Sequence, residues 1–178
     1  MNIDLTGKNA VVCGASKGIG RATAVELAAL GASVTVVARN QEKLIQLCRE
    51  LKTEPRQKHH HLVADFNKSD ELKSVITNHV SKNGPFHILV NNSGGPPAGL
   101  AQAANVESFL SAFLQHLIGN HIMVQAVLDG MKSEKYGRII NIISTSVKQP
   151  VRGLGVSNTI RGAVANWAKT LANELGQY

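Results

Sequence analysis

Short apolar runs alternate with longer amphipathic segments along the chain. The apolar runs predict buried strands over 8–13, 33–38, 61–64, 87–90 and 138–143. The other segments space their apolar residues as helices do, which predicts helices over 19–30, 42–51, 69–81, 106–131 and 155–175. Strands that alternate with helices form a parallel sheet covered by helices on both faces. We therefore expect an α/β fold.

Residues that start or stop helices fall at the boundaries of these segments. Gly31 follows the first predicted helix and suits a C-terminal cap, while Asn40 and Ser69 suit N-terminal caps. Gly84 and Pro85 interrupt the chain before the fourth predicted strand. With 178 residues, 43% of them hydrophobic and 17% charged, the sequence suits one compact domain over 1–178.

Composition and patterning argue against several functional classes. Because the sequence has no apolar stretch of about 18 residues and no leader-like N-terminus, we expect a cytoplasmic protein without a membrane span. The formal charge is +7, but Lys and Arg are dispersed, so we predict a solvated basic surface and no nucleic-acid partner. Cys13 and Cys48 are too few for a disulfide framework, and we expect buried thiols. The adjacent His59, His60 and His61 alternate between strand faces, so we predict no metal site.

A glycine-rich turn joins the first predicted strand to the first predicted helix. Gly14 allows the chain to turn sharply. Gly18 and Gly20 remove side chains where the backbone approaches a pyrophosphate and where the helix packs on the sheet. The N–H groups and the dipole of a helix N-terminus favour negative charge at this point. The turn therefore predicts a dinucleotide-binding site.

The spacing Gly-x-x-x-Gly-x-Gly resembles the phosphate-binding turn of the short-chain dehydrogenase/reductase family, and the resemblance extends over essentially the whole chain. Asp65 follows the third strand as the family's adenine-contacting aspartate does. Segment 91–94 resembles the family's Asn-Asn-Ala-Gly motif, and 137–144 resembles its fifth strand with the catalytic serine at the end. The resemblance implies a three-layer Rossmann fold whose doubly wound parallel sheet has the strand order 3-2-1-4-5. Because family members continue with further strands, we expect the domain to be incomplete at its C-terminus.

The end of the second predicted strand favours NADP(H) over NAD(H) as the cofactor. NAD selectivity usually comes from an acidic residue at this strand end, and 37–40 contains none. Arg39 can stack on the adenine or pair with the 2′-phosphate, and Lys17 lies where the family's NADP-using members place a second cation. Glu42 suits a partner for the helix dipole. The resemblance implies a cofactor-binding set of Gly14, Ser16, Lys17, Gly18, Ile19, Gly20, Arg39, Asp65, Asn91, Ser93, Gly94 and Arg161.

The sequence departs from the family at its catalytic positions. In the family, a tyrosine exchanges the hydroxyl proton, a lysine one turn later holds the ribose, and a serine hydrogen-bonds the reacting oxygen. Ser144 matches the serine, whereas the family spacing puts Ser157 at the tyrosine position and Arg161 at the lysine position. Arg161 keeps the positive charge on the same helical face and can bind the nicotinamide ribose. Ser157 has no useful acidity near neutral pH.

A fourth catalytic position belongs to the family's asparagine, which supports a water relay. Aligning 125–128 with the family's long helix places His116 there, although Asn120, one turn further, matches after a small shift. A histidine that titrates near neutrality can supply the missing proton, and the alternative is a surface or helix-packing histidine. If chemistry occurs, the proton comes from His116, water or a group on the substrate.

Two functions stay open from the sequence. The first is an NADP(H)-dependent oxidoreductase that interconverts a small-molecule carbonyl and a secondary alcohol, with a 3-oxoacyl thioester suggested by family analogy. The second is a dinucleotide-binding sensor or scaffold that has lost ordinary catalysis. The loop over 94–99 follows the fourth strand, so we expect it to line the nicotinamide side of the site. Under both functions the resemblance implies a homodimer or homotetramer formed through the helices 106–131 and 155–175.

Overall fold

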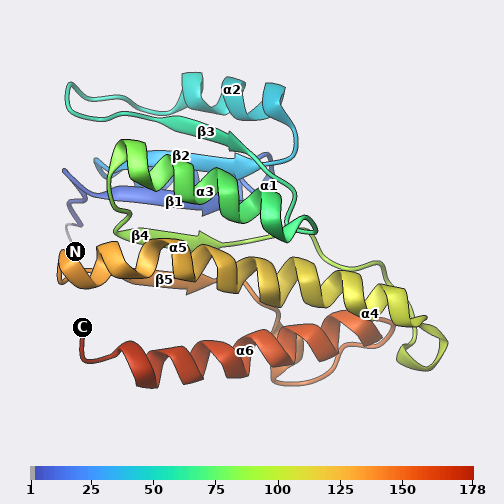
Figure 1. The fold of residues 1–178 in the computed structure, drawn as a ribbon. Helices are drawn as coiled ribbons and strands as arrows, with labels where there is room; N and C mark the ends of the chain where they lie inside the picture. The colour runs from blue at the N-terminus through green and yellow to red at the C-terminus, as the bar shows by residue number, and fades with distance from the viewer. Residues whose placement is uncertain (1–2) are drawn as a thin grey trace.

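A five-stranded parallel sheet forms the centre of the computed structural model, which describes residues 3–178 (Figure 1). The strand order β3-β2-β1-β4-β5 confirms the prediction. The strands are β1 (Asn9–Cys13), β2 (Ser33–Ala38), β3 (His60–Val63), β4 (Ile88–Asn91) and β5 (Arg138–Asn141). Since all neighbouring strands are parallel, their carboxyl ends share one edge of the sheet. The strand order reverses between β1 and β4, where doubly wound folds bind their ligands.

Helices cover both faces of this sheet, which gives the three-layer arrangement expected of a Rossmann fold (Figure 1). Helices α1 and α2 pack on one face, and α3, α5 and part of α6 pack on the other. Their bounds are α1 (Gly18–Ala29), α2 (Gln41–Glu50), α3 (Ser69–Asn83), α4 (Val106–Phe113), α5 (Gly119–Ser133) and α6 (Gly155–Leu175).

The predicted helix caps are confirmed at two of three positions. The side chain of Asn40 accepts a hydrogen bond from the backbone N–H of Lys43 at 2.9 Å, which caps α2. Gly31 follows α1 with φ of +97°, the left-handed conformation that ends many helices. Ser69 is instead the first residue of α3, and Lys68 precedes it without a side-chain cap. The prediction of a Ser69 cap is therefore wrong by one residue.

The long helix predicted over 106–131 consists of three parts. A π-helical turn, Leu114–Ile118, joins α4 to α5. The backbone stays helical through this turn, so the spacing of apolar residues does not reveal it. The wider turn contains the buried His116. Gly119 follows it and allows close packing, because a Cβ there would lie 2.7 Å from the ring of Phe66.

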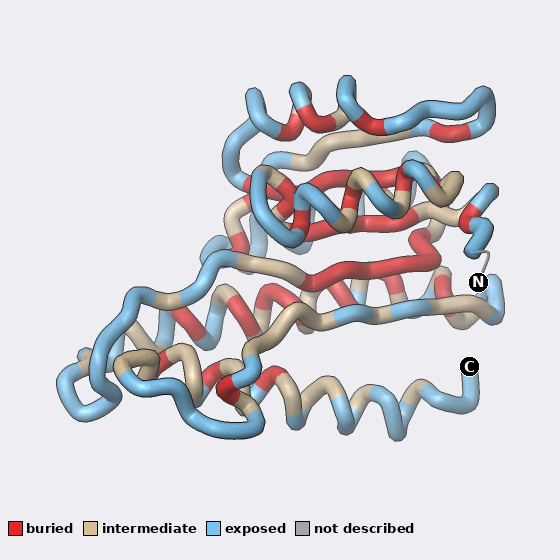
Figure 2. The backbone as a smooth tube through the Cα atoms, turned by 180° about the vertical axis from the view of Figure 1, so that it is seen from behind, coloured by how far each residue is buried: buried red, intermediate tan, exposed pale blue. Residues whose placement is uncertain are grey.

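The inner strands are buried on both faces, which explains their continuous apolar runs. Ala10 and Val12 of β1 pack toward α1 and α2, while Val11 and Cys13 pack toward α3 and α5. Burial raises the pKa of the Cys13 thiol to about 12. Figure 2 shows the buried residues concentrated in the inner strands and on the inward sides of the helices. At the sheet edge, β5 is more open, and Ile140 is 46% exposed.

Two surface features bear on membrane and partner contacts. Within residues 3–178, no helix is both long and apolar enough to cross a membrane. Large exposed apolar side chains gather on α4 and the turn after it: Val106, Leu110, Phe113 and Leu114. Helix α6 has no such side chain in the described part of the chain.

Candidate functional site

The glycine-rich turn lies at the carboxyl end of β1. Gly14 and Gly18 have φ of +59° and +57°, in the left-handed region that favours glycine. A Cβ on Gly18 would meet nothing within 4 Å, so its backbone conformation alone favours glycine. A Cβ on Gly20 would lie 2.5 Å from the carbonyl oxygen of Gly14. The glycines therefore permit the tight turn and bring the start of α1 close against it.

Asn92 fastens this turn to the end of β4. Its Nδ2 donates to the carbonyl oxygens of Cys13 and Gly14, both at 3.3 Å. A Cβ on Gly14 would collide with the backbone carbonyl of Asn92, so this glycine is needed for space as well as for its backbone conformation. Asn92 is absent from the predicted cofactor set. Its place directly after β4, the strand that pairs with β1, is the signal that could have identified it.

Asn91, which the family resemblance assigns to the cofactor, lies inside the sheet and is 1% exposed. Its Nδ2 donates to Oδ1 of Asn141 at 2.9 Å, across the pair of β4 and β5. Its side chain thus bonds within the sheet, whereas that of Asn92, the residue after β4, reaches the glycine turn. Asn91 therefore stabilises the sheet behind the site.

A cleft of about 490 Å³ opens between the glycine turn, the end of β2 and the segment after β4. This volume lies within the range of small-molecule and cofactor sites. The predicted residues that line it are Gly14, Ser16, Lys17, Gly18, Ile19, Arg39, Asp65, Ser93 and Gly94. The lining is completed by Ala38, Asn40, Lys43, Ala64, Phe66, Asn92 and Gln115. Gly20, Asn91 and Arg161, all predicted, do not line this cleft.

The cleft carries more positive than negative charge. Lys17, Arg39 and Lys43 line it, and none of them forms an ion pair within residues 3–178. Asp65 is the one carboxylate of the lining, and it accepts a hydrogen bond from the backbone N–H of Asn67 at 3.0 Å. Lys43 was not predicted, although its position one turn into the helix after β2 suits a phosphate contact. The arrangement favours a ligand with several negative charges.

His116 lies beneath this cleft and is 1% exposed. Its Nδ1 lies 2.7 Å from Oγ of Ser93, a cleft residue, and its Nε2 has no hydrogen-bond partner among residues 3–178. Burial, and secondly the charge of Arg161, lower the pKa of His116 to about 4. The expectation that His116 titrates near neutrality is therefore wrong, because the ring is neutral at pH 7. The ring packs inside the wide helical turn. Asn120, one turn on, is also buried.

Arg161 and Ser144 both belong to the region that follows β5. Nη1 of Arg161 donates to the carbonyl oxygen of Ile142 at 2.7 Å. Burial lowers the pKa of Arg161, although a guanidinium stays protonated at neutral pH. Oγ of Ser144 accepts from the backbone N–H of Ser146 at 3.1 Å and caps a short 3₁₀ turn. Ser157 is half-buried in the first turn of α6, four residues before Arg161 and on the same helical face.

These residues can stabilise charge better than they can release a proton. Ser144 and Ser157 supply hydroxyl groups, and Arg161 supplies a permanent positive charge close to His116. Hydroxyls and a cation held in place stabilise a developing oxyanion. Because His116 is neutral at pH 7, it does not hold a proton ready for such an oxygen.

Comparison with known sequences places this geometry in context. A family model described as short chain dehydrogenase matches residues 8–178. A ketoacyl reductase assigned to the granaticin polyketide synthase of Streptomyces violaceoruber is 35% identical over 170 residues, which cover 94% of this chain and 62% of that protein. The 3-ketodihydrosphingosine reductase of Mus musculus is 30% identical over 178 residues, covering 98% of this chain and 54% of that protein. The chain thus spans between half and two thirds of the length of these relatives.

Solved structures give the same picture. The L-sorbose reductase of Gluconobacter frateurii, complexed with NADPH and L-sorbose, superposes with a TM-score of 0.93 and 28% identity. The match covers 99% of this chain and 67% of that one. A metagenomic short-chain oxidoreductase in complex with NADP superposes with a TM-score of 0.89 and 31% identity, covering 97% of this chain and 77% of that one.

Proposed function

The chain belongs to the short-chain dehydrogenase family, and we propose on this premise that it is an NADP(H)-dependent oxidoreductase that interconverts a carbonyl and a secondary alcohol. The observation that carries the proposal is the cleft at the glycine turn, where Lys17, Arg39 and Lys43 face a single carboxylate. Two structurally similar proteins, the L-sorbose reductase and the metagenomic oxidoreductase, were solved with NADPH and NADP respectively, which supports the choice of cofactor.

The charges around the end of β2 suit NADP(H) better than NAD(H). The 2′-phosphate of NADP(H) needs cations, and both Arg39 and Lys43 line the cleft at this place. NAD(H) is selected by a carboxylate that binds both ribose hydroxyls at the end of the second strand. The cleft has no carboxylate there, since Asp65 follows β3. We therefore assign Arg39 and Lys43 to the 2′-phosphate and Lys17 to the phosphates at the glycine turn.

In this proposal Arg161, Ser144 and Ser157 surround the substrate oxygen that gains or loses the proton, and this place is called the reacting end. When bound, the nicotinamide gives or takes the hydride. Arg161 is held by the carbonyl of Ile142 through Nη1, which leaves its other N–H donors for the ribose or for the oxygen that becomes negative. The hydroxyl groups of Ser144 and Ser157 donate to the same oxygen in this proposal.

Proton movement in this proposal runs through Ser93 and His116. Ser93 lines the cleft, and its hydroxyl lies 2.7 Å from the buried imidazole. A neutral imidazole accepts a proton at one nitrogen and gives one from the other. For each proton that Nδ1 gives to Ser93, Nε2 has to take one up, and since Nε2 has no partner among residues 3–178, we assign that proton to water. We therefore propose that His116 relays protons and does not act as a general acid in its protonated form.

The substrate that we propose is a ketone on an acyl or hydrocarbon chain, of the 3-oxoacyl type. Two similar proteins are named as a ketoacyl reductase and a 3-ketodihydrosphingosine reductase. A cavity of about 230 Å³ lies near the start of α6, and Pro96, Pro97, Leu100 and Val156 contribute to its largely apolar lining. Val156 directly precedes Ser157, so an apolar chain in this cavity would lie beside the reacting end.

Titration of the protein with NADPH and NADH, followed by nicotinamide fluorescence, tests the cofactor assignment. We expect NADPH to bind about tenfold or more tightly, and Arg39→Gln to remove most of that preference, since a charged hydrogen bond contributes roughly 1.5–3 kcal/mol. Arg49→Gln removes an equal charge from the end of α2 outside the cleft and should leave both affinities unchanged. Equal affinity of the native protein for both cofactors would refute the assignment. Tight NADPH binding without turnover of any 3-oxoacyl thioester would favour the sensor or scaffold function.

We further propose that the protein forms a homo-oligomer through α4. Val106 is 67% exposed and Leu110 is 56% exposed, and together with Phe113 they follow the spacing of one helical face. An exposed apolar stripe of this kind marks a contact surface. Two helices, 106–131 and 155–175, were expected to form the interface. Because α6 exposes no large apolar side chain in the described residues, we propose the interface on α4 alone.

A further inference from the structure

We infer that a second ligand site, for a small anion of the phosphate or phosphate-monoester class, lies at the amino-terminal edge of the sheet. A cavity of about 280 Å³ opens there between the starts of β1, β2 and β3 and the end of α3. In Figure 1 this edge lies opposite the carboxyl ends of the strands, where the glycine turn is found. The cavity shares no lining residue with the cofactor cleft.

The lining of this cavity has an uncompensated positive charge. Arg56, Lys58 and Lys82 line it together with His60 and His79, and the lining contains no carboxylate. None of the three permanent cations forms an ion pair within residues 3–178. Cations brought together without a counter-charge repel one another, so an anion between them relieves that repulsion.

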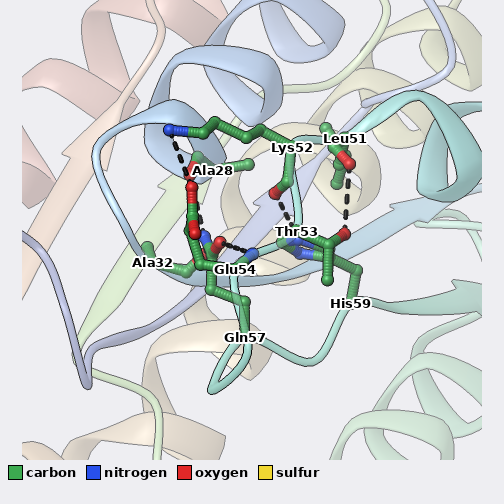
Figure 3. A network of polar contacts seen from close by, with 8 residues as sticks. All are labelled: Ala28, Ala32, Leu51, Lys52, Thr53, Glu54, Gln57 and His59. Atoms are coloured by element: carbon green, nitrogen blue, oxygen red, sulfur yellow. Dashed lines mark hydrogen bonds and ion pairs between the residues drawn. The ribbon is translucent and has the colours of Figure 1, made fainter.

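The loop that presents two of these cations is fastened to the fold, as Figure 3 shows. Gln57 is buried, and its Nε2 donates to the carbonyl oxygens of Ala28 at 2.8 Å and Ala32 at 2.9 Å. Its Oε1 accepts from the backbone N–H of Glu54 at 2.6 Å. Arg56 and Lys58 are the two neighbours of Gln57 in the chain, so the same contacts fix the backbone of both.

Further contacts hold the loop from its other end. Nδ1 of His59 accepts from the backbone N–H of Val34 at 3.1 Å, so its Nε2 carries the proton and donates to the carbonyl oxygen of Lys52 at 2.9 Å. The backbone N–H of Lys58 donates to Oγ of Ser33 at 3.0 Å. These contacts fix the backbone of the loop without a ligand, so binding has to order only the exposed side chains of Arg56 and Lys58.

A chain of hydrogen bonds leaves a donor at the buried side of the cavity. The Asn83 amide nitrogen can only donate, so Nδ1 of His79 accepts from it at 3.3 Å. Nε2 of His79 then carries the proton and donates to Oγ1 of Thr35 at 3.2 Å, which leaves the Thr35 hydroxyl free to donate. The rings of His60 and His79 meet edge to face at 5.1 Å. Burial lowers the pKa of both histidines, and the charge of Lys58 is among the further causes at His60.

The size and donors of the cavity select the class of ligand. A volume of about 280 Å³ falls just below the range typical of larger cofactor and drug-sized sites, so the ligand is small. A guanidinium pairs with two phosphate oxygens at once, and lysine ammonium groups add point charges. Arg56, Lys58, Lys82 and the Thr35 hydroxyl together match a tetrahedral dianion better than a flat carboxylate.

Titration with inorganic phosphate at constant ionic strength, followed by NMR of the ¹⁵N-labelled histidine rings, tests the inference. We expect saturable shifts of the His60 and His79 signals, while His116 and His121, which do not line the cavity, stay in place. The NMR shifts do not depend on the nicotinamide cofactor. A negative result would therefore contradict the phosphate site without bearing on the proposed oxidoreductase activity. A parallel titration with glycerol 3-phosphate separates the two sources of the anion, because a site for a phosphate monoester binds it more tightly than free phosphate.

Paired variants distinguish a site from general charge screening. Arg56→Gln combined with Lys58→Gln should weaken phosphate binding about tenfold or more, which corresponds to about 1.4 kcal/mol or more. Arg49→Gln combined with Lys73→Gln removes the same charge from exposed positions outside the cavity and should leave binding unchanged. Shifts that grow linearly without saturation, or equal weakening in both double variants, would overturn the inference.

Discussion

The neutral, buried state of His116 predicts a loss of stability in acid that the substitution His116→Asn should remove. The ordinary pKa of histidine is 6.5, and in the folded protein the pKa of His116 is about 4. As the pH falls below 6.5, the unfolded chain takes up a proton at this position before the folded chain does. The stability is therefore complete above pH 6.5 and is lost progressively between pH 6.5 and pH 4.

The two pKa values set the size of the effect. At pH 4.5, a pKa of 6.5 in the unfolded chain and of about 4 in the folded one correspond to about 2.5 kcal/mol of lost unfolding free energy. Burial also lowers the pKa of His60, His79 and His87, so they act in the same direction. These three residues are present in both proteins, and their contributions cancel when the variant is compared with the native chain.

Urea unfolding followed by tryptophan fluorescence measures this difference. Trp167 is the single tryptophan, is partly buried against the core, and its ring lies 6.2 Å from that of His121 on α5. With an m-value of about 2 kcal/mol/M, the native midpoint should fall about 1 M further than that of His116→Asn between pH 7.5 and pH 4.5. Ser93→Ala is the matched control, because it removes the hydrogen bond but keeps the ring buried, so the pH dependence should persist. The same pH dependence in the native protein and in His116→Asn would refute the buried neutral ring, and the relay with it.

Further predictions concern the glycine turn and the α4 surface. Gly14→Ala should cost about 3 kcal/mol or more of unfolding free energy, because the new Cβ meets the Asn92 backbone in addition to the strain at positive φ. Gly18→Ala should cost about 1–2 kcal/mol from the backbone conformation alone, and equal losses in thermal unfolding would contradict the crowding at Gly14. Leu110→Asp should reduce the mass measured by light scattering to that of a monomer, while Gln125→Asp on an exposed side of α5 should not. A Leu110→Asp protein of unchanged mass would exclude the α4 interface.

The sheet and most helices were predictable because hydrophobic spacing reports burial directly. The strand β2 spans the predicted residues, since every side chain from Val34 to Ala38 is buried. The π-helical turn at Leu114–Ile118 was not predictable, because one wider turn changes the helical spacing too little to stand out. The observed ends of helices and strands differ from the predicted ends by one or two residues, because the apolar pattern reports burial whereas the elements are defined by backbone hydrogen bonds.

The site was predictable where it depends on backbone conformation and less so where it depends on burial. Three glycines at a strand-to-helix junction identify the turn, because only glycine satisfies its geometry. The different roles of Asn91 and Asn92 depend on where β4 ends: Asn91 is its last residue and pairs with Asn141, while Asn92 follows it and bonds to the glycine turn. The pKa of His116 follows from its burial under Ser93, which no local pattern in the sequence reports.

Two departures from the family pattern, Ser93 and Arg161, lie close to the buried His116, and this arrangement supports the proposed activity. Ser93 stands where the family's Asn-Asn-Ala-Gly motif has alanine, and its hydroxyl lies 2.7 Å from Nδ1 of His116, one of the two candidates for the asparagine position. Arg161, at the lysine position, lies near enough to lower the pKa of that histidine. Here a serine and a histidine pair with each other, and the ring beside the guanidinium is neutral, so no two positive charges are buried together. The serine–histidine pair and the neutral ring beside the guanidinium are therefore the observations that support our proposal of altered oxidoreductase chemistry, and the turnover assay decides between it and the sensor or scaffold function.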